Sequence, residues 1–220
     1  MKPLIIFGIG QIAEVAYYYF SEDSDYNVAG FTVDDTYLDR SELFGLPTVA
    51  SENVAEHFPP GDFDFFAAVG YGQMNATRRE KVTLAQAQGY DIAHYVSSRA
   101  FVWKGFEPRP NLFLLEDNTI QPHAEIGENV TLWSGNHIGH HAVIGDDVFL
   151  CSHVVVSGAA RIGRSSFLGV NATVGDNVKI GAENVIGAGA IILKDTADKA
   201  VFPTKQTEIS KVPSNRLRLR

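Results

Sequence analysis

Residues 132–168 read LWSGNHIGHHAVIGDDVFLCSHVVVSGAARIGRSSFL, and this stretch decides the fold. Counted from Leu132, an aliphatic residue stands at every sixth position, and the same spacing continues on both sides of the stretch. A small or β-branched residue follows four places after most of these aliphatics, and a glycine directly follows many of them. An α-helix would repeat its apolar positions every 3.6 residues and a half-buried strand every two, so the pattern is a hexapeptide repeat. The fourteen aliphatic positions are Leu114, Ile120, Ile126, Leu132, Ile138, Ile144, Leu150, Val156, Ile162, Leu168, Val174, Ile180, Ile186 and Ile192.

The six-residue period predicts a parallel β-helix, because each hexapeptide can supply one short strand and one tight corner. The aliphatic side chain would point into a narrow core, and the glycine would adopt backbone conformations that a Cβ hinders. Three hexapeptides would close one triangular coil, so that residues eighteen apart stack and successive coils pair their backbones in a parallel ladder. The repeat is long enough for about four to five coils.

The part of the chain before the repeat alternates short apolar runs with helical stretches. This order predicts a parallel sheet with crossover helices. Only about 95 residues precede the coils, which is enough for one mononucleotide-binding half of a Rossmann fold and not for a full dinucleotide-binding domain. The expected strands are residues 4–7, 28–33 and 64–69, and the expected helices are residues 14–20 and 77–88.

A GxGxxA turn follows the first expected strand and leads into the first expected helix. Its glycines, Gly8 and Gly10, would let a phosphate approach the helix N-terminus beside Gln11. The second expected strand ends in Asp34 and Asp35, whose carboxylates can accept a hydrogen bond from a ribose hydroxyl. The motif favours nucleotide binding; the open alternatives are a tight turn without a ligand and a merely solvated pair of aspartates.

The third expected strand runs into Gly70 and Tyr71, which we assign to the same substrate site. The fold class that we predict is an N-terminal Rossmann-like α/β half-domain followed by a left-handed parallel β-helix. Its expected division is a nucleotide-sugar-binding domain over 1–100, a connection over 101–113, the β-helix over 114–195, and a cap or tail over 196–220.

Composition excludes several classes of protein. The formal net charge of −8 argues against a general nucleic-acid-binding surface, which needs a dense cationic stripe. The single cysteine, Cys151, cannot form an internal disulfide, and no CxxC pair is present to hold zinc. No stretch approaches the roughly 20 apolar residues of a membrane span, and the N-terminal apolar run is too short for a secretory signal. We therefore expect a cytoplasmic protein that binds neither nucleic acid nor membrane.

Four of the seven histidines fall between His137 and His153, and two of them, His140 and His141, occupy an expected corner of one hexapeptide. An outward imidazole on a rigid coil is well placed to accept a proton from an amine or hydroxyl that attacks a thioester. The alternative is a solvated corner histidine. His123 lies eighteen residues before His141, so these two side chains should stack in one column.

These features together resemble the nucleotide-sugar acyltransferases of the sialic-acid O-acetyltransferase-like and bacillosamine N-acetyltransferase-like family. The resemblance covers nearly the whole chain and is carried by the Gly8-Ile9-Gly10 turn, by Asp34-Asp35, and by the runs at residues 138–146, 156–158 and 167–172. It implies an acetyl-CoA-dependent transferase, without a metal, that acts on a nucleotide-linked amino sugar in bacterial surface glycan (lipopolysaccharide) biosynthesis. It also implies a homotrimer with acetyl-CoA between the subunits.

The resemblance assigns residues as well. It makes His140 the general base and lets Gly158, Val170, Asn171, Gly187 and Ala188 line the CoA groove. This sequence departs from the family at two places: His141 stands where an acid often follows the catalytic histidine, and Gln11-Ile12 replaces a Gly-His pair. Between nitrogen and oxygen acceptors we favour nitrogen, because a neutral amine is the better nucleophile toward a thioester.

Further expectations concern assembly and the rival functions. Trp133 and Phe149 should point outward from the coils, and such apolar patches usually mark interfaces. One rival function is a β-helix zinc enzyme of carbonic anhydrase type, for which the histidine spacings do not fit. Another is a scaffold that has lost its chemistry, which the histidine at position 141 favours. A nicotinamide oxidoreductase, suggested by GxGxxA, would need a second sheet half.

Overall fold

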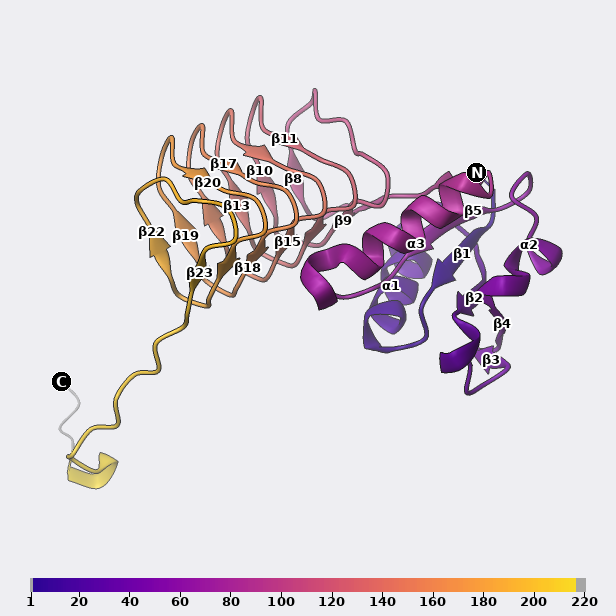
Figure 1. Cartoon of the computed structure of the whole chain (residues 1–220), viewed down its shortest axis with the longest axis horizontal. Coiled ribbons are helices and arrows are strands. Elements are labelled where there is room, and N and C mark those ends of the chain that lie inside the picture. The colour runs from indigo at the N-terminus through magenta and orange to yellow at the C-terminus, as the bar shows by residue number, and fades with distance from the viewer. Residues whose placement is uncertain (1, 217–220) are drawn as a thin grey trace.

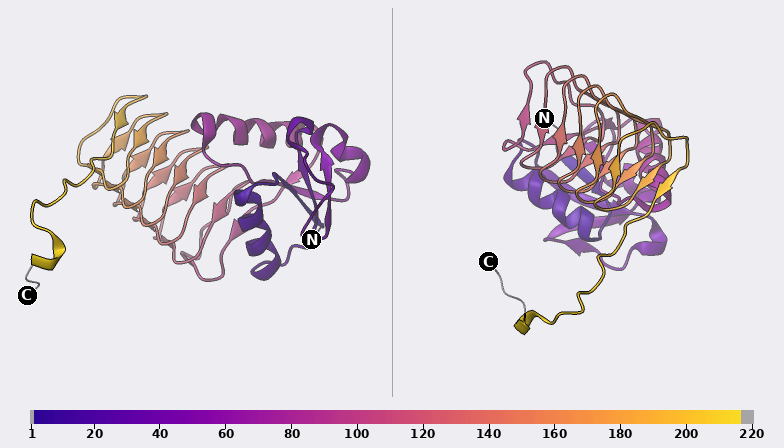
Figure 2. Two further views of the ribbon diagram at one scale, coloured as in Figure 1. Left: turned by 90° about the horizontal axis from the view of Figure 1, so that it is seen from below. Right: turned by 90° about the vertical axis from the view of Figure 1, so that its left-hand side faces the viewer.

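The computed structural model describes residues 2–216, which form an α/β domain and a stack of triangular coils in contact with it (Figure 1). The α/β domain lies at the end of the stack where the coils begin, and the chain after the last coil runs away from both parts (Figure 2). The domain comprises β1 (Leu4–Phe7), α1 (Gln11–Glu22), β2 (Val28–Val33), β3 (Glu42–Leu43), β4 (Leu46–Ala50), α2 (Val54–His57), β5 (Asp64–Ala67), α3 (Ala76–Ala87) and β6 (Asp91–Ile92), with 3-10 turns at Asp35–Tyr37, Ser51–Asn53 and Gly72–Asn75.

A six-stranded sheet with the order β3-β4-β2-β1-β5-β6 forms the centre of this domain. Its strands are parallel except for β3, which forms an antiparallel edge hairpin with β4. Leu4 and Ile6 of the central strand pack on the side of helix α1, while Ile5 and Phe7 pack on the side of helices α2 and α3. Helices therefore cover both faces of the sheet, as a crossover βαβ order requires.

The three expected strands and two expected helices of this half are confirmed. The first helix is longer than expected because it begins directly after Gly10, and α3 begins at Ala76. The hairpin of β3 and β4, the short helix α2 and the strand β6 were not expected, since runs of two to five residues carry too little periodicity to be recognised.

Each of the fourteen repeat aliphatics is the second residue of a two-residue strand and is at most 5% exposed. Successive coils pair in parallel with a shift of eighteen residues, so that Ile138 lies between Ile120 and Val156. The strands are β7 (Tyr95–Val96), β8 (Phe101–Val102), β9 (Phe113–Leu114), β10 (Thr119–Ile120), β11 (Glu125–Ile126), β12 (Thr131–Leu132), β13 (His137–Ile138), β14 (Val143–Ile144), β15 (Phe149–Leu150), β16 (Val155–Val156), β17 (Arg161–Ile162), β18 (Phe167–Leu168), β19 (Thr173–Val174), β20 (Lys179–Ile180), β21 (Val185–Ile186), β22 (Ile191–Ile192) and β23 (Val201–Phe202), and a 3-10 turn covers Ser214–Arg216.

These strands align in three flat faces. We call the sheet of β7, β9, β12, β15, β18, β21 and β23 the first face, that of β8, β10, β13, β16, β19 and β22 the second face, and that of β11, β14, β17 and β20 the third face. Strand pairing begins before and ends after the range 114–195 that the repeat suggests, because β7, β8 and β23 also join the faces. Phe202 packs against the core of the coils at their far end.

The glycines of the repeat have a different role from the expected one. A Cβ on Gly139 would lie 2.7 Å from the backbone nitrogen of Gly158, and a Cβ on Gly163 would lie 2.5 Å from that of Ala182. Glycine is therefore needed there because the next coil's backbone is too close for a side chain. The left-handed conformation occurs two residues later, at positions such as His141 with φ 59°, and the expectation that the repeat glycines adopt backbone conformations that a Cβ hinders is wrong.

A ladder of buried polar side chains fixes the α/β domain to the coils. Asn111 accepts a hydrogen bond from the N–H of Ala67 at the end of β5 and donates one to Asn129 in the next coil, each at 2.8 Å. Asn129 in turn donates to Asp147 at 2.8 Å, one coil further along. The ladder thus connects the central sheet to the same corner of two successive coils of the β-helix.

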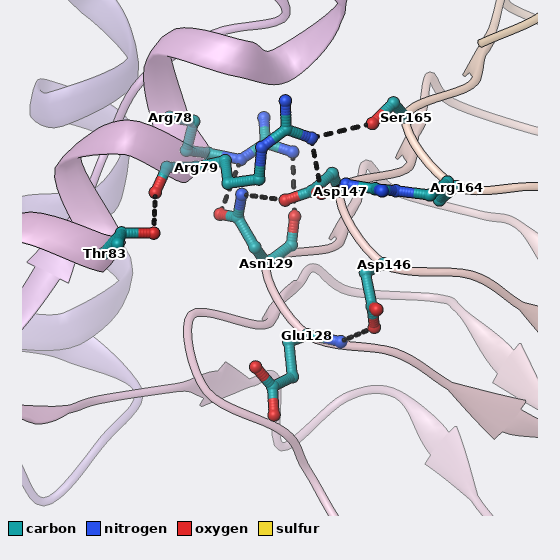
Figure 3. Close-up of polar contacts among 9 residues, drawn as sticks. All are labelled: Arg78, Arg79, Thr83, Glu128, Asn129, Asp146, Asp147, Arg164 and Ser165. Atoms are coloured by element: carbon teal, nitrogen blue, oxygen red, sulfur yellow. Dashed lines mark hydrogen bonds and ion pairs between the residues drawn. The ribbon is translucent and has the colours of Figure 1, made fainter. Parts of the chain in front are cut away.

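Helix α3 presents two arginines to this ladder (Figure 3). Arg78 is 1% exposed and donates to the side-chain and main-chain oxygens of Asn129, each at 2.9 Å. Burial lowers the pKa of Arg78 to about 10, which still leaves the guanidinium charged at neutral pH. Arg79 donates to the carboxylate of Asp147 at 2.8 Å and to the hydroxyl of Ser165 at 3.0 Å.

The expectation that Trp133 and Phe149 form an exposed patch is wrong. Phe149 is 2% exposed, because the ring of Tyr71 lies 5.1 Å away and the guanidinium of Arg78 lies 5.7 Å over it. Trp133 is half-buried against the core of the α/β domain. Both side chains point out of the coils, but the α/β domain of the same chain covers them. Within residues 2–216, no helix combines the length and the apolar character needed to cross a bilayer.

We predict that Arg78→Met lowers the free energy of unfolding by about 2–4 kcal/mol, because the buried oxygens of Asn129 would lose their charged donor. Urea denaturation checks this. Arg164→Met is the matched control: Arg164 is 61% exposed and lies 3.8 Å from Asp147, so its loss should cost less than about 1 kcal/mol. Equal effects of the two substitutions would contradict the role given to Arg78.

Candidate active site

A cavity of about 700 Å³ opens at the carboxyl ends of β1, β2 and β5. Ligands of open parallel sheets bind at this edge, and the volume is within the usual range for small-molecule sites. Residues from the beginnings of α1 and α3, including Gln11 and Thr77, line its wall. Two helix N-termini therefore contribute partial positive charge to one cavity, which suits a phosphate group.

The two glycines of the GxGxxA turn serve this cavity differently. Gly8 has a φ of 118°, and a Cβ there would lie 2.8 Å from the carbonyl oxygen of Ala68, so the backbone itself requires glycine. Gly10 has no atom within 4 Å of the position of a Cβ. The turn therefore does not require glycine at position 10, and the absence of a side chain there leaves open space in the cavity.

Asp34 is held in place by two donors from different elements. Its Oδ1 accepts from the hydroxyl of Ser51 at 2.9 Å and from Lys81 Nζ of α3 at 2.7 Å. Lys81 and Arg40 both line the cavity, where Lys81 pairs with Asp34 and Arg40 with Asp39, each at 2.7 Å. Both cations suit a diphosphate, provided that it takes over part of these ion pairs. The sequence pattern did not single out either cation; the available signal for Lys81 was its place one helical turn after Thr77, at the start of the helix that follows β5.

Five of the seven residues assigned to the substrate site line this cavity: Gly8, Gly10, Gln11, Asp34 and Gly70. The structure places the other two elsewhere. The backbone N–H of Asp35 donates to Glu52 as a 3-10 turn begins. The ring of Tyr71 packs on Phe149 and Phe167 of the first face, so this side chain contributes to the contact between the two parts of the chain.

The corner between the second and third faces carries three exposed histidines, His123, His140 and His141. We call this corner, formed by residues 121–124, 139–142, 157–160 and 175–178, the histidine corner. The rings of His123 and His141 stack with their centroids 4.8 Å apart, as the eighteen-residue spacing predicts. His140 Nδ1 lies 3.2 Å from His141 Nδ1; in a hydrogen bond between them, one nitrogen carries the hydrogen and the other accepts it. The clustering of histidines along the sequence does not persist in space, because His137 lies on the second face and His153 on a different corner.

Gly158 and Asp176 occupy the positions below His140 in the next two coils. A Cβ on Gly158 would lie 2.8 Å from Cε1 and 2.9 Å from Nε2 of His140, and 3.3 Å from Oδ1 of Asp176. Glycine at this position therefore leaves a gap between the imidazole and the carboxylate. The sequence pattern did not single out Asp176, because its proximity to His140 depends on the orientation of two side chains across an intervening coil.

The residues assigned to the CoA groove lie at two corners that border the second face. Gly158 belongs to the histidine corner, whereas Val170, Asn171, Gly187 and Ala188 follow strands β18 and β21 at the corner between the first and second faces. Val170 is 43% exposed, and Asn171 adopts the left-handed conformation at this corner. A single chain thus does not bring all five together at one point.

Metal-assisted catalysis and a cysteine nucleophile are the two other chemistries that the side chains of the coils could offer. Among residues 2–216, no three His, Cys, Asp or Glu side chains are grouped so that they could hold a metal ion. Burial raises the pKa of the Cys151 thiol to about 11, so this side chain carries almost no thiolate at neutral pH. The histidine corner is the part of the coils where two exposed imidazoles lie in contact, and an imidazole has the chemistry of a proton acceptor.

The sequence matches the family model "Bacterial transferase hexapeptide (six repeats)" at residues 123–158 and 159–194. No curated protein is significantly similar to the chain. The structure is similar to that of PerB from Caulobacter crescentus in complex with CoA and GDP-perosamine, with a TM-score of 0.83 at 21% identity over 93% of this chain and 95% of that one.

Two other solved structures show the same likeness. The acetyltransferase domain of PglB from Neisseria gonorrhoeae, in complex with acetyl coenzyme A, has a TM-score of 0.79 at 21% identity and covers 92% of this chain and 96% of that chain. WeeI from Acinetobacter baumannii has a TM-score of 0.64 at 18% identity and covers 91% and 96%. The chain has the fold of these proteins. The predicted fold class, a Rossmann-like half-domain followed by a left-handed parallel β-helix, is confirmed.

We predict that Gly10→Val raises the KM for a sugar nucleotide about tenfold or more, because the new side chain would fill the cavity. The KM for acetyl-CoA should stay within about twofold, and the melting temperature should not change, since nothing lies within 4 Å of the new Cβ. Steady-state kinetics with each substrate varied in turn check this. Gly61→Val, which also meets nothing within 4 Å and lies outside the cavity, is the control. Equal damage to both KM values by Gly10→Val would mean that the turn is structural only.

Proposed function

We propose that the protein transfers an acetyl group from acetyl-CoA to the amine of a nucleotide-linked amino sugar, in the cytoplasm and for bacterial surface glycan biosynthesis. The observation that carries this proposal is His140, an exposed imidazole above a glycine gap on a rigid corner of the coils. The likeness to PerB with CoA and GDP-perosamine supports it, as does the cavity beside two helix N-termini. Two further solved structures similar to this chain are of perosamine N-acetyltransferase from Caulobacter crescentus with CoA and GDP-perosamine, and in each one histidine is replaced, by asparagine or by alanine.

In the proposed mechanism the cavity of the α/β domain holds the nucleotide. Lys81 and Arg40 neutralise the diphosphate, and Gly10 allows it to approach α1. Asp34 accepts a hydrogen bond from the ribose through the oxygen that Ser51 and Lys81 do not engage. These residues bind and orient the acceptor and take no part in bond making.

His140 acts as the general base in this proposal. Its Nδ1 faces His141, which leaves Nε2 to take a proton from the acceptor nitrogen while that nitrogen attacks the thioester carbonyl. The transfer is direct, because the raised pKa of Cys151 does not favour an acyl-cysteine intermediate. His141 orients the imidazole of His140 through their Nδ1 atoms. The CoA groove follows Gly158 at one border of the second face and Val170, Asn171, Gly187 and Ala188 at the other.

A complete site in this proposal requires a homotrimer. The α/β domain packs on the first face through Tyr71, whereas the histidine corner joins the other two faces and lies opposite. The nucleotide cavity of one chain would therefore meet the histidine corner of a second chain. The second face offers exposed apolar side chains for that contact, among them Phe101 and Ile191.

We predict that His140→Ala lowers kcat about 10²- to 10⁴-fold with an unchanged melting temperature, because the base is removed from an exposed corner. The proposed function is checked by incubating the parent chain with acetyl-CoA and nucleotide-linked amino sugars, beginning with GDP-perosamine, and identifying the acetylated product by its mass. The rate of thiol release from acetyl-CoA then gives kcat for the parent and for His140→Ala. His57→Ala removes an exposed imidazole outside the site and should leave the rate within about twofold. A larger loss at His141→Ala would move the base to His141, and inactivity of the parent chain with every acceptor would favour a scaffold.

We also predict a mass in light scattering three times the 24.0 kDa of one chain. Co-expressed Gly10→Val and His140→Ala chains should regain activity at low sugar-nucleotide concentration, because mixed trimers contain sites with an intact cavity and an intact histidine. A monomer at micromolar concentration, or no gain on mixing, would contradict the composite site.

A further inference from the structure

Asp176 differs from the other corner aspartates of the coils. Asp146 occupies the same position of its hexapeptide, and its carboxylate accepts the backbone N–H of Glu128 eighteen residues earlier. Asp195 and Asp198 likewise accept backbone N–H groups, those of Lys179 and Ala182. Within residues 2–216, Asp176 forms no such hydrogen bond. A role in binding the backbone of a neighbouring coil therefore does not explain why a carboxylate stands at this position.

The carboxylate of Asp176 is also free of a neutralising neighbour. No lysine, arginine or histidine nitrogen of the described residues lies within 4.0 Å of it, although Arg161 and Lys179 are on the adjacent third face. Asp176 is exposed, and no cation of the described residues offsets the charge of its carboxylate.

That space adjoins the reactive nitrogen of His140. Nε2 of His140 and Oδ1 of Asp176 lie within 2.9 Å and 3.3 Å of one point, the place that a Cβ of Gly158 would occupy, yet they are more than 4.0 Å from each other. That point is about one bond length from Cα of Gly158, so an acceptor nitrogen must lie further out from the coil, where it has the imidazole of His140 on one side and the carboxylate of Asp176 on the other. The gap exists only because residue 158 is glycine.

We propose that Asp176 binds the ammonium form of the acceptor beside His140 and thereby selects an amine over a hydroxyl as the acceptor; this rests on the proposed acetyl transfer. A primary amine is largely protonated at neutral pH and carries a positive charge that a hydroxyl lacks. The carboxylate attracts that charge; one proton is then lost to solvent to give the neutral amine, and Nε2 of His140 takes the second proton as the nitrogen attacks the thioester.

The chemical step balances without another reactant. The amine nitrogen forms a bond to the thioester carbonyl carbon, and the carbon–sulfur bond breaks. The nitrogen loses two protons in total: the one on His140 passes to the departing thiolate to give CoA-SH, and the other goes to solvent. The carboxylate of Asp176 exchanges no proton in this step; it lowers the free energy of the cationic acceptor and of the imidazolium near it.

The test compares Asp176→Asn with the parent chain on two acceptors, GDP-perosamine and its analogue with a hydroxyl group in place of the amine. We expect kcat/KM for the amine to fall about tenfold to a hundredfold, and that for the hydroxyl analogue to stay within about twofold, since only the amine interacts as a charge. Asp176→Glu should keep most of the preference for the amine. The matched control is Glu125→Gln, which removes an exposed carboxylate from the third face and should change neither value.

Two results for Asp176→Asn would overturn the assignment: an equal loss of kcat/KM on both acceptors, or no loss on either. A lower melting temperature of Asp176→Asn, together with the equal loss, would mean a structural role for the carboxylate. Absence of transfer by the parent chain to either acceptor is a different result, because it would overturn the proposed function itself and the role of Asp176 with it.

Discussion

The eighteen-residue register between successive coils is the constraint on which the other features of the molecule depend. It is set by the parallel backbone ladder and by glycines such as Gly139, where the next coil's backbone leaves no room for a Cβ. Once this register is fixed, residues eighteen apart must lie above one another. The register stacks His123 on His141, places His140 over Gly158 and Asp176, and aligns Asn111 with Asn129 and Asp147.

Helix α3 transmits that order to the nucleotide cavity. Its Arg78 and Arg79 are bound to the polar ladder of the coils, and Thr77 and Lys81 of the same helix line the cavity. A single short helix thus determines where the cavity lies relative to the first face. Arg78 is suited to this because a buried guanidinium with several acceptors in fixed directions loses much free energy if any of them moves.

The sequence predicts the coils almost completely, because one buried aliphatic in every six residues can be read without knowledge of any long-range contact. It also predicts the positions of Gly8, Gly10 and Asp34, since a strand, a turn and a helix follow each other along the chain. It does not reveal Lys81 and Arg40 as cavity residues, because they come from elements that only the folded sheet brings together. Phe149 was misjudged for a related reason: the repeat shows that the side chain points outward, but not that Tyr71 and Arg78 cover it.

The histidine pair shows what a change at one position requires of the rest of a corner. A carboxylate at position 141 could fix the tautomer of His140 and also stabilise the imidazolium, whereas the imidazole of His141 can do only the first while it is neutral. The negative charge must then come from another coil if the base is to act as proposed. On the histidine corner, Asp176, whose carboxylate has neither a backbone N–H nor a cation as partner among residues 2–216, would provide it on the side of Nε2, where the acceptor would lie. A charge on that side acts on the acceptor as well as on the base, so replacing the acid at position 141 would alter which nucleophile is preferred as well as how strongly His140 is activated.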